Sequence, residues 1–275
     1  MMRIDLHLHS TFSDGTRTPE ELALLGKQRR LRVMSLTDHD TVSGIPRFLK
    51  GCRRCGLQGL AGVELSAEAP HTMHILGYAF DPASEELVRT LEHVRQGRGE
   101  RNRRIFENLE KLDMPLSTEE VLREAGEEVL GRPHFAKAMV RRGYVKTTEE
   151  AFSRYLERGK PGYADRDRLS PEECIRLIRS AGGVAVLAHP VQTGLDDDAL
   201  EALLKELKDQ GLWGLESLYA MHTPEQQLSY LRMGDRVGLY PTGGSDFHGN
   251  NRSGRDLGIS FEESSLPWAR LGLEL

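Results

Sequence analysis

Histidines and acidic residues, the side chains that most often bind divalent metals, recur at the ends of short apolar segments in this chain. The first segment, RIDLHLH, carries His7 and His9, and Asp14 follows in the turn SDGT. Residues i and i+2 of a strand project to the same face, so the two imidazoles could chelate one ion. Half-buried strands also carry histidines for packing, and Asp14 also fits an ordinary turn aspartate. This segment alone leaves both interpretations open.

The second apolar segment ends in TDHDT, which contains Asp38, His39 and Asp40. Neighbouring residues of a strand face opposite sides, so Asp38 and His39 cannot both point inward in regular extended geometry. We expect His39 to be the ligand. Asp38 is assigned to the catalytic residues, as a carboxylate that orients an imidazole or lies beside the substrate. Asp40 is expected to be the N-cap of the next turn.

Four further segments end in residues of the same types. Glu64 ends LAGVE, where an unpartnered buried glutamate would be costly, so it either faces solvent or coordinates cations. His74 lies in MHILGY and by itself fits a core histidine. His189 follows the apolar run VAVLA, and Asp246 and His248 lie in the glycine-rich segment GGSDFHG. In total, six of the chain's ten histidines and three carboxylates occupy such ends, a pattern that packing does not explain.

Repeated strand–helix units must position these residues. The predicted strands cover residues 3–9, 31–38, 57–65, 73–80, 184–190, 212–219 and 239–246. The predicted helices cover 19–30, 45–56, 171–183, 196–211 and 224–234, and Thr18 is the expected N-cap of the first. Such units imply a parallel sheet, open or closed, whose active site forms at the carboxyl ends of the strands. The clusters therefore predict a polynuclear metal site there.

The composition is that of a soluble globular α/β protein, with 38% hydrophobic and 29% charged residues in 275. No apolar run approaches the ~20 residues that span a bilayer, and the N-terminus lacks a secretion signal. Three cysteines argue against a disulfide framework, so we expect a cytoplasmic protein without membrane contact. The net charge of −5 argues against broad nonspecific binding of nucleic acid. No protein partner can be inferred.

Residues 99–165 interrupt the strand–helix rhythm and are expected to form a charged helical insertion in a barrel made of 1–98 and 166–275. The run RGERNRR at 98–104 could be a basic RNA track, but a solvated helix face with glutamate pairs is the preferred interpretation. The motif CRRC at 52–55 is interpreted as helix interior, because Cys174 is the only further cysteine and a four-cysteine zinc site needs four.

The ordered motifs DLHLHS with SDG, TDHDT, GVELS, HILGY, AHP and GSDFHG resemble those of the PHP (polymerase and histidinol phosphatase) family over nearly the whole chain outside the insertion. The resemblance implies a distorted (β/α)7 barrel that binds three divalent ions, Mn²⁺ first and Fe or Zn²⁺ as alternatives. It also assigns nine ligands by ion: His7, His9, Glu64 and Asp246 to the first; Glu64, His74 and His189 to the second; and Asp14, His39 and His248 to the third.

Three further segments, GRPHFA, ERGKPGY and YAMHTPEQ, are similar to a stand-alone, TrpH- or YciV-like group within this family. The group includes a nucleoside 3′,5′-bisphosphate phosphatase and an exoribonuclease that trims RNA from its 5′ end. By this similarity Arg132, His134, Lys160 and His222 are candidate substrate-binding residues, and His134 and His222 are also candidate catalytic residues. Arg132 suits a bidentate phosphate contact, although it also fits an ordinary surface arginine, and Lys160 and His222 are similar cases.

The expected function is removal of the 3′-phosphate from nucleoside 3′,5′-bisphosphates, with short RNA 5′ ends as further substrates. The ions would outweigh the charge of the ligand carboxylates and lower the pKa of a bridging water from ~15.7 towards ~7, so that hydroxide attacks phosphorus in line. The alternatives are a histidinol-phosphate-type phosphomonoesterase and a noncatalytic metal- or nucleotide-binding module. The insertion favours the first interpretation because it could recognise a second phosphate, and the complete ligand set argues against the noncatalytic one.

Overall fold

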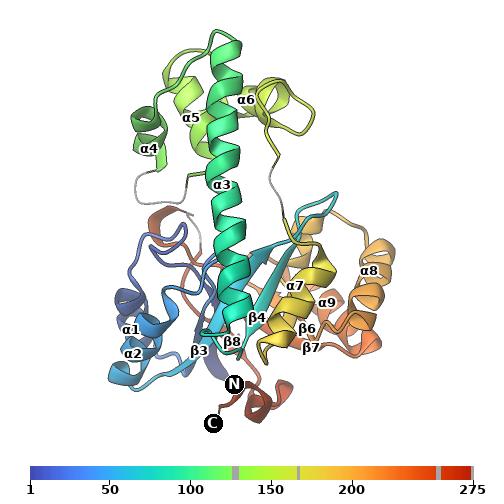
Figure 1. The fold of residues 1–275 in the computed structure, drawn as a ribbon. Coiled ribbons are helices and arrows are strands. Elements are labelled where there is room, and N and C mark those ends of the chain that lie inside the picture. The colour runs from blue at the N-terminus through green and yellow to red at the C-terminus, as the bar shows by residue number, and fades with distance from the viewer. Residues whose placement is uncertain (126–129, 166–167, 252–254, 274–275) are drawn as a thin grey trace. The chain divides into compact units, whose positions relative to one another are not determined.

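The computed structural model describes residues 1–125, 130–165, 168–251 and 255–273 (Figure 1). The chain divides into two compact units, which are described separately. The first, here called the barrel unit, comprises Met1–Leu91 and Arg168–Leu275. The second, the helical unit, comprises Glu92–Asp167.

The barrel unit contains one sheet in the order β7-β6-β5-β4-β3-β2-β1-β8. Its strands are β1 (Met2–Leu8), β2 (Val33–Leu36), β3 (Gln58–Ser66), β4 (His74–Tyr78), β5 (Val184–Leu187), β6 (Gly214–Tyr219), β7 (Tyr240–Gly244) and β8 (Ile259–Phe261). The seven predicted strands are all present, and the sheet forms a nearly closed barrel. The predicted distorted (β/α)7 barrel is therefore confirmed.

The barrel approaches closure where β7 meets β1. Just beyond the two strand ends, the backbone N–H of His9 donates to the carbonyl of Phe247 at 3.0 Å. Gly244 permits this approach, because a Cβ at this position would lie 2.4 Å from the Cβ of His7. The last residues of β7 thus lie directly against the strand that carries the first two predicted ligands.

The prediction of a parallel sheet is correct for most pairs and wrong for two strands. β4 runs antiparallel to both β3 and β5, and the short edge strand β8, which was not predicted, runs antiparallel to β1. A parallel return needs a crossover of about a dozen or more residues. The connection 67–73 is too short for one, so β3 and β4 form a hairpin.

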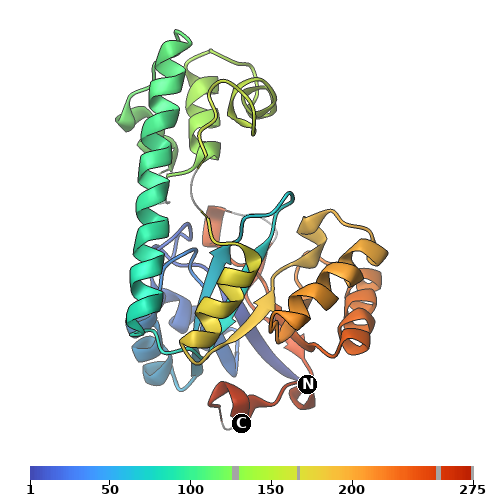
Figure 2. The same ribbon diagram turned by 45° about the vertical axis from the view of Figure 1, so that its right-hand side comes forward.

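Five helices cover the strands of the barrel unit: α1 (Pro19–Gln28), α2 (Ile45–Cys55), α7 (Pro171–Ser180), α8 (Asp197–Asp209) and α9 (Pro224–Val237). In Figures 1 and 2, α8 and α9 pack side by side on the outer side of β6 and β7. Thr18, Ser170 and Thr223 each form a capping box at a helix start, so the predicted N-cap Thr18 is confirmed. CRRC forms the last turn of α2, so its assignment to a helix is confirmed, and burial raises the pKa of Cys52 to about 12.

Strand β3 shows how the barrel separates core from site. Val63 and Leu65 are buried in an apolar cluster with Ile75 of β4 and Ile178 of α7. Side chains alternate along a strand, so Glu64 between them faces the opposite side of the sheet. The apolar residues thereby hold a charged side chain inside the barrel.

The helical unit contains most of the long helix α3 (Glu85–Lys111), together with α4 (Thr118–Ala125), α5 (Arg132–Arg141), α6 (Thr148–Ala151) and a π-helical turn (Phe152–Leu156). Its described residues include no strand. Its own core contains Ile105, Leu109, Phe135 and Met139.

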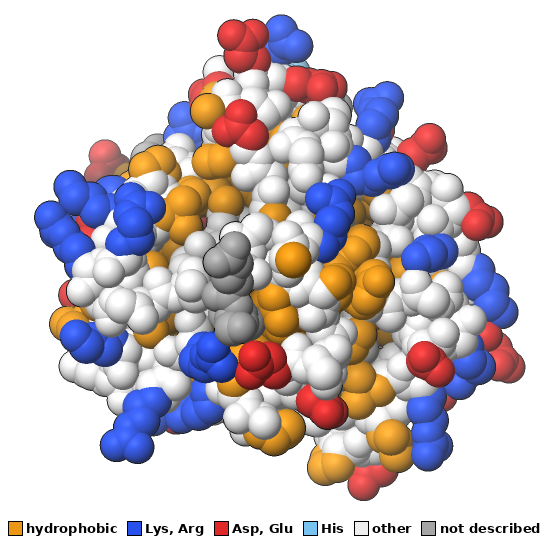
Figure 3. Space-filling model, turned by 90° about the horizontal axis from the view of Figure 1, so that it is seen from below, with side chains coloured by type: hydrophobic (Ala, Val, Ile, Leu, Met, Phe, Trp, Pro, Cys, Tyr) orange, Lys and Arg blue, Asp and Glu red, His pale blue; other side chains and the backbone are white. Residues whose placement is uncertain are grey.

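The charged run 98–104 lies in α3. Arg103 pairs with Glu100 and Glu107 at helical spacing, which confirms the predicted solvated face. Arg101 and Asn102 are only 6% and 8% exposed, so the prediction is wrong for these two residues. Seen from below in Figure 3, hydrophobic side chains lie across the middle of the face, Lys and Arg side chains gather along its left edge, and Asp and Glu side chains are scattered around it. In the described part of the chain, no helix combines the length and apolarity that a membrane span requires.

Candidate metal centre

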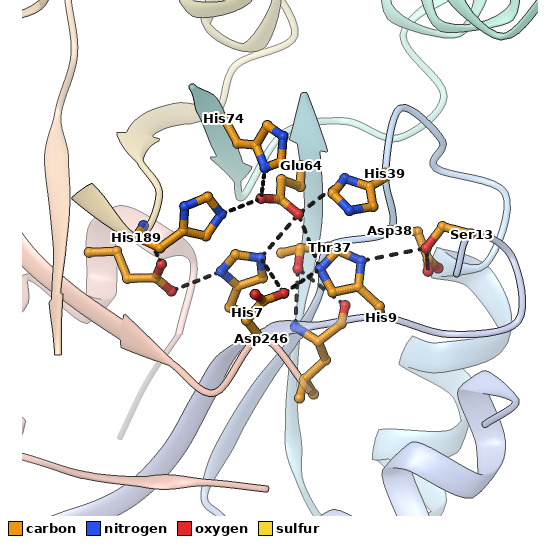
Figure 4. A network of polar contacts seen from close by, with 12 residues as sticks. His7, His9, Ser13, Thr37, Asp38, His39, Glu64, His74, His189 and Asp246 are labelled. Carbon is orange, nitrogen blue, oxygen red and sulfur yellow. Dashed lines mark hydrogen bonds and ion pairs between the residues drawn. The ribbon is translucent and has the colours of Figure 1, made fainter. Parts of the chain in front are cut away.

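The nine predicted ligands come together at one end of the barrel. Figure 4 labels His7, His9, His39, Glu64, His74, His189 and Asp246 among them. Most lie at or just past the carboxyl ends of β1, β2, β3, β5 and β7. His74 is the first residue of β4 and pairs with Ser66, the last residue of β3. Because β4 is antiparallel, its amino end lies at the same edge as the carboxyl end of β3. The hairpin, which was not predicted, is therefore what brings His74 to the site.

Glu64 lies at the centre of this cluster, 1% exposed, with five imidazoles facing its two oxygens. The distances to the facing ring nitrogens are 3.2 Å for His7, 3.1 Å for His9 and 3.2 Å for His39 from Oε2, and 2.6 Å for His74 and 2.9 Å for His189 from Oε1. A carboxylate in this position can serve two neighbouring cations, one through each oxygen.

Two further carboxylates lie beside Glu64. Asp246 Oδ1 is 3.3 Å from His9 Nε2 and 3.6 Å from His7 Nε2. Asp14 Oδ1 is 3.2 Å from His248 Nε2, and its Oδ2 is 3.7 Å from His39 Nε2. Each carboxylate therefore faces more than one imidazole.

The potential ligand atoms fall into three groups in which all atoms lie within 4.8 Å of one another: His7, His9, Glu64 and Asp246; His9, Asp14, His39 and His248; and His39, Glu64 and His74. The first group has the composition expected for the first ion. The second contains the ligands expected for the third ion, with His9 in addition. The remaining group has His39 where His189 was expected, although His189 faces the same Glu64 oxygen as His74.

The hydrogen-bonding state of these atoms fits divalent cations. Several buried ring nitrogens and one carboxylate oxygen have no hydrogen-bond partner within the described residues: His7 Nε2, His9 Nε2, His39 Nδ1, His248 Nε2 and Glu64 Oε2. Buried polar atoms are normally satisfied, so a convergent set of exceptions requires an explanation. Imidazole nitrogens and carboxylate oxygens together are a donor set that Mn²⁺, Fe and Zn²⁺ accept.

Neighbouring acceptors set the tautomers of two imidazoles. His7 Nδ1 lies 2.9 Å from Glu216 Oε1, and His248 Nδ1 lies 2.8 Å from the carbonyl of Asp246. A carboxylate and a carbonyl only accept, so both rings carry a proton on Nδ1. When either ring is neutral, the lone pair of its Nε2 is available and points into the cluster.

The electrostatics of the site favour binding of cations. Burial opposes ionisation of Glu64, but the neighbouring His39 and His74 outweigh it and hold the pKa of Glu64 well below its ordinary value. Burial likewise opposes ionisation of Asp246, and His7 and His9 hold its pKa well below the usual range. Both carboxylates are therefore ionised in the folded chain and attract divalent cations.

Asp40 does not cap the following helix, so that prediction is wrong. The N-cap of α2 is Gly44. The carboxylate of Asp40 accepts hydrogen bonds from the backbone N–H and the hydroxyl of Ser66, and its own N–H donates to the carbonyl of Glu64. Asp40 therefore ties the loop after β2 to the end of β3, next to the central carboxylate.

Three of the six non-glycine residues with a positive φ in the described part of the chain lie at the cluster. His189, Asp246 and Asp40 have positive φ angles of 23°, 54° and 51°. Such conformations cost non-glycine residues of order 1–3 kcal/mol each and persist only where the surroundings enforce them. Two of the three residues, His189 and Asp246, are predicted ligands. Placing their side chains in the cluster therefore requires an unfavourable backbone conformation.

Asp38 is buried, and its bonds go to serines rather than directly to an imidazole. It accepts from the N–H and the hydroxyl of Ser10, each at 2.7 Å, and from the hydroxyl of Ser13 at 2.6 Å. Ser13 Oγ lies 3.5 Å from His9 Nδ1. Asp38 thus orders the loop that carries Asp14 and reaches His9 through Ser13.

Sequence reasoning missed three residues around the site. Asp5 is fully buried and accepts from the N–H of Ser245, next to Asp246. Glu216 is fully buried beside His7, and Arg255 forms an ion pair with Asp246. A charged residue inside the apolar strand LWGLESLY was a usable signal for Glu216. No local pattern distinguished Arg255.

His222 is buried in the barrel unit, just before α9. Its Nδ1–H donates to the carbonyl of Ser217 at 3.0 Å, and its ring packs between Tyr219 and Tyr230. Burial lowers the pKa of His222. The neutral ring therefore offers an acceptor at Nε2.

The other predicted substrate residues lie in the helical unit. The guanidinium of Arg132 lies 5.4 Å from the ring centre of Tyr163. His134 is 5% exposed, and its Nδ1 accepts from the N–H of Gly131 at 3.0 Å, closing the first turn of α5. Lys160 is exposed in the loop that follows the π-helical turn.

The ligand cluster and the barrel agree with comparisons to known proteins. A family model described as PHP domain matches residues 5–164. This chain belongs to the PHP domain family. The resemblance predicted from the motifs is therefore confirmed.

Relatives of this PHP protein match it over nearly their whole length. It is 36% identical over 260 residues to the 3′,5′-nucleoside bisphosphate phosphatase of Chromobacterium violaceum, covering 94% of this chain and 91% of that protein. It is 33% identical over 277 residues to the 5′-3′ exoribonuclease Rnm of Salmonella typhimurium, covering 98% and 88%. A solved amidohydrolase structure from C. violaceum, with bound sulfate and no metal, superimposes with a TM-score of 0.82 at 33% identity, covering 98% and 95%.

Proposed function

We propose that this PHP-family chain is a metal-dependent phosphoesterase that removes the 3′-phosphate from nucleoside 3′,5′-bisphosphates and also cleaves RNA from its 5′ end. The observation that carries the phosphoesterase assignment is the convergence of nine ligand residues, with Glu64 at their centre and nitrogen or oxygen donors on every one. The relatives' activities support the substrate class. Both activities break the ester at the 3′-oxygen of a nucleotide, so one site can serve both.

The proposed cofactor is a set of three divalent ions, Mn²⁺ or else Fe or Zn²⁺. When bound, such ions supply a nucleophilic hydroxide at neutral pH and neutralise charge on the phosphoryl oxygens. The chain's own contribution is to hold the ligands in place. His7 and His9 lie at the end of β1, and Glu64 lies in β3 of the same sheet. All three are buried, so little reorganisation accompanies binding.

The barrel formed by residues 1–98 and 166–275 is proposed to hold the metal centre, and the insertion 99–165 to recognise the substrate. Within the insertion, Arg132 is proposed to bind a phosphate and Lys160 to add positive charge. Because His134 Nδ1 accepts from Gly131, a neutral His134 carries its proton on Nε2 and can donate it. His222 has the opposite tautomer, and we therefore propose His134 as the proton donor.

A comparison of substrates tests the proposal. Phosphate release is measured with added Mn²⁺ from 3′-phosphoadenosine 5′-phosphate and from histidinol phosphate at equal concentration, and nucleotide release from a short 5′-phosphorylated RNA. We expect turnover of the bisphosphate and of the RNA. Turnover of histidinol phosphate alone would overturn the substrate class. A chain that binds Mn²⁺ but hydrolyses none of the three would instead be a noncatalytic module.

A further inference from the structure

Glu216 uses both of its carboxylate oxygens on predicted metal ligands. It lies in β6 and is fully buried. Oε1 is 2.9 Å from His7 Nδ1, and Oε2 accepts the backbone N–H of His189 at 2.7 Å. One carboxylate therefore contacts two segments that are far apart in the sequence.

A buried carboxylate is costly unless its oxygens receive hydrogen bonds. Among the described residues, no lysine or arginine forms an ion pair with Glu216, and its bonds come from the His7 ring and the His189 backbone. The barrel retains this charge at a position where an apolar residue would otherwise be expected. A role in holding the two donors accounts for its presence.

The two donors belong to different ions in the proposed ligand set. His7 is assigned to the first ion and His189 to the second, and their rings lie 5.6 Å apart and nearly parallel. His189 has a strained backbone with φ of 23°, which its bond to Glu216 helps to maintain. We propose that Glu216 is a positioning residue that organises the first and second metal positions together. This inference rests on the proposed metal centre.

The geometry defines what Glu216 contributes to each ligand. Its Oε1 keeps the proton of His7 on Nδ1, leaves Nε2 as the ligand atom and makes that nitrogen a stronger donor. Its Oε2 fixes the main chain from which the His189 ring extends toward Glu64. Only a carboxylate of this length presents two acceptors in these two places.

The variant Glu216→Gln tests the inference because it keeps the shape and removes one acceptor. If the amide oxygen faces His189, its NH₂ group faces His7 and forces the proton of that ring onto Nε2. If the oxygen faces His7, the NH₂ group opposes the N–H of His189. Either orientation damages one ligand, and we expect roughly 10–100-fold weaker binding of Mn²⁺.

The measurements are Mn²⁺ affinity by competition with a chromophoric chelator, ions bound per chain by elemental analysis, and melting of the metal-free protein. Glu68→Gln is the matched control, because Glu68 lies in the same unit and pairs with Arg168 outside the cluster. We expect Glu216→Gln to lose affinity and stoichiometry and Glu68→Gln to retain both. A merely structural role would lower the melting temperature and leave Mn²⁺ affinity unchanged.

The outcomes separate this inference from the proposed function. If the Mn²⁺ affinity of Glu216→Gln stays within about twofold of the parent chain, the inference is overturned and the proposed function is not. Such a result would mean that His7 and His189 do not need Glu216, because loss of a positioning contact should cost roughly 10–100-fold. A parent chain that binds no Mn²⁺ would overturn the metal centre and the inference with it. If Glu216→Gln does not fold, Glu216→Asp replaces it. That variant keeps the charge but is too short to reach both donors, so unchanged Mn²⁺ affinity would again overturn the inference.

Discussion

Buried histidines occur in both units of this chain, and their hydrogen bonds differ. In the barrel unit, His9 Nε2 faces Glu64 and Asp246 and has no hydrogen-bond partner among the described residues. In the helical unit, His134 Nδ1 accepts the N–H of Gly131 and closes a helix turn. Burial of a histidine therefore does not identify a metal site. An unsatisfied nitrogen that faces carboxylates does.

Carboxylates show the same contrast. Glu64 in the barrel unit is buried and surrounded by imidazoles, without an arginine or lysine partner in the described part of the chain. Glu100 in the helical unit is exposed and pairs with Arg103 and Arg104. The carboxylate of Glu64 is therefore available to bind a cation, whereas the charge of Glu100 is already neutralised by arginines of the same helix.

The largest expected effect comes from removing a ligand in the barrel unit. His9→Ala or Asp246→Ala should lower kcat/KM by at least about 10³-fold, because each variant removes a ligand of the first ion and with it several kcal/mol of charge stabilisation in the transition state. Phosphate release measures the loss, and circular dichroism should show the fold largely retained. His93→Ala, an exposed histidine on α3, is the control. Full activity of either ligand variant would refute the site.

Metal removal should destabilise the barrel unit more than the helical unit. A ligand that binds only the folded state at 100 times its Kd adds about 2.7 kcal/mol of stability. Chelation of Mn²⁺ should therefore speed hydrogen exchange in β1 and β3, measured by mass spectrometry. The core of α5 should change little. Equal changes in both units would contradict the assignment of the metals to the barrel.

In the helical unit, Arg132→Met should weaken substrate binding without affecting metal binding. A hydrogen bond to a charged group contributes about 1.5–3 kcal/mol, so KM for the bisphosphate should rise about 10–100-fold. Metal content by elemental analysis should be unchanged. Arg103→Met, at an ion-paired exposed arginine of the same unit, should leave KM unaltered. An unchanged KM in Arg132→Met would mark Arg132 as an ordinary surface arginine.

The smallest effect is expected at Glu100. The hydrogen bond from Arg103, opposed by slight desolvation and aided by Arg104, lowers the pKa of Glu100 to about 2 from its ordinary 4.5. A carboxyl whose pKa is lower in the folded chain stabilises the fold above about pH 4.5, and this stabilisation is lost as the pH falls towards 2.

Unfolding of the parent chain and of Glu100→Gln, followed from pH 7 to pH 2, checks this sign. Because the pair is exposed, the difference at pH 7 should be small and should shrink in high salt. A difference that grows as the pH falls would contradict the proposed cause.

Several local features could be predicted from the sequence because their causes lie within a few residues. The helix starts TPEE, SPEE and TPEQ each place a capping hydroxyl three residues before an acceptor side chain, and each forms a capping box. The antiparallel direction of β4 could also have been predicted from the sequence, because the connection 67–73 is too short for a crossover. The edge strand β8 covers only Ile259–Phe261 and carries too little pattern to be recognised.

The sequence by itself determined which residue types stand at the strand ends, because alternation along a strand and the order of strand and helix are local properties. Only the tertiary structure decided which imidazole faces which carboxylate, and that Glu216 rather than Asp38 contacts a ligand ring directly. The physical reason is distance along the chain. Glu216 lies 209 residues from His7 and 27 from His189, and the register of the closed sheet, which no local pattern encodes, brings the three together.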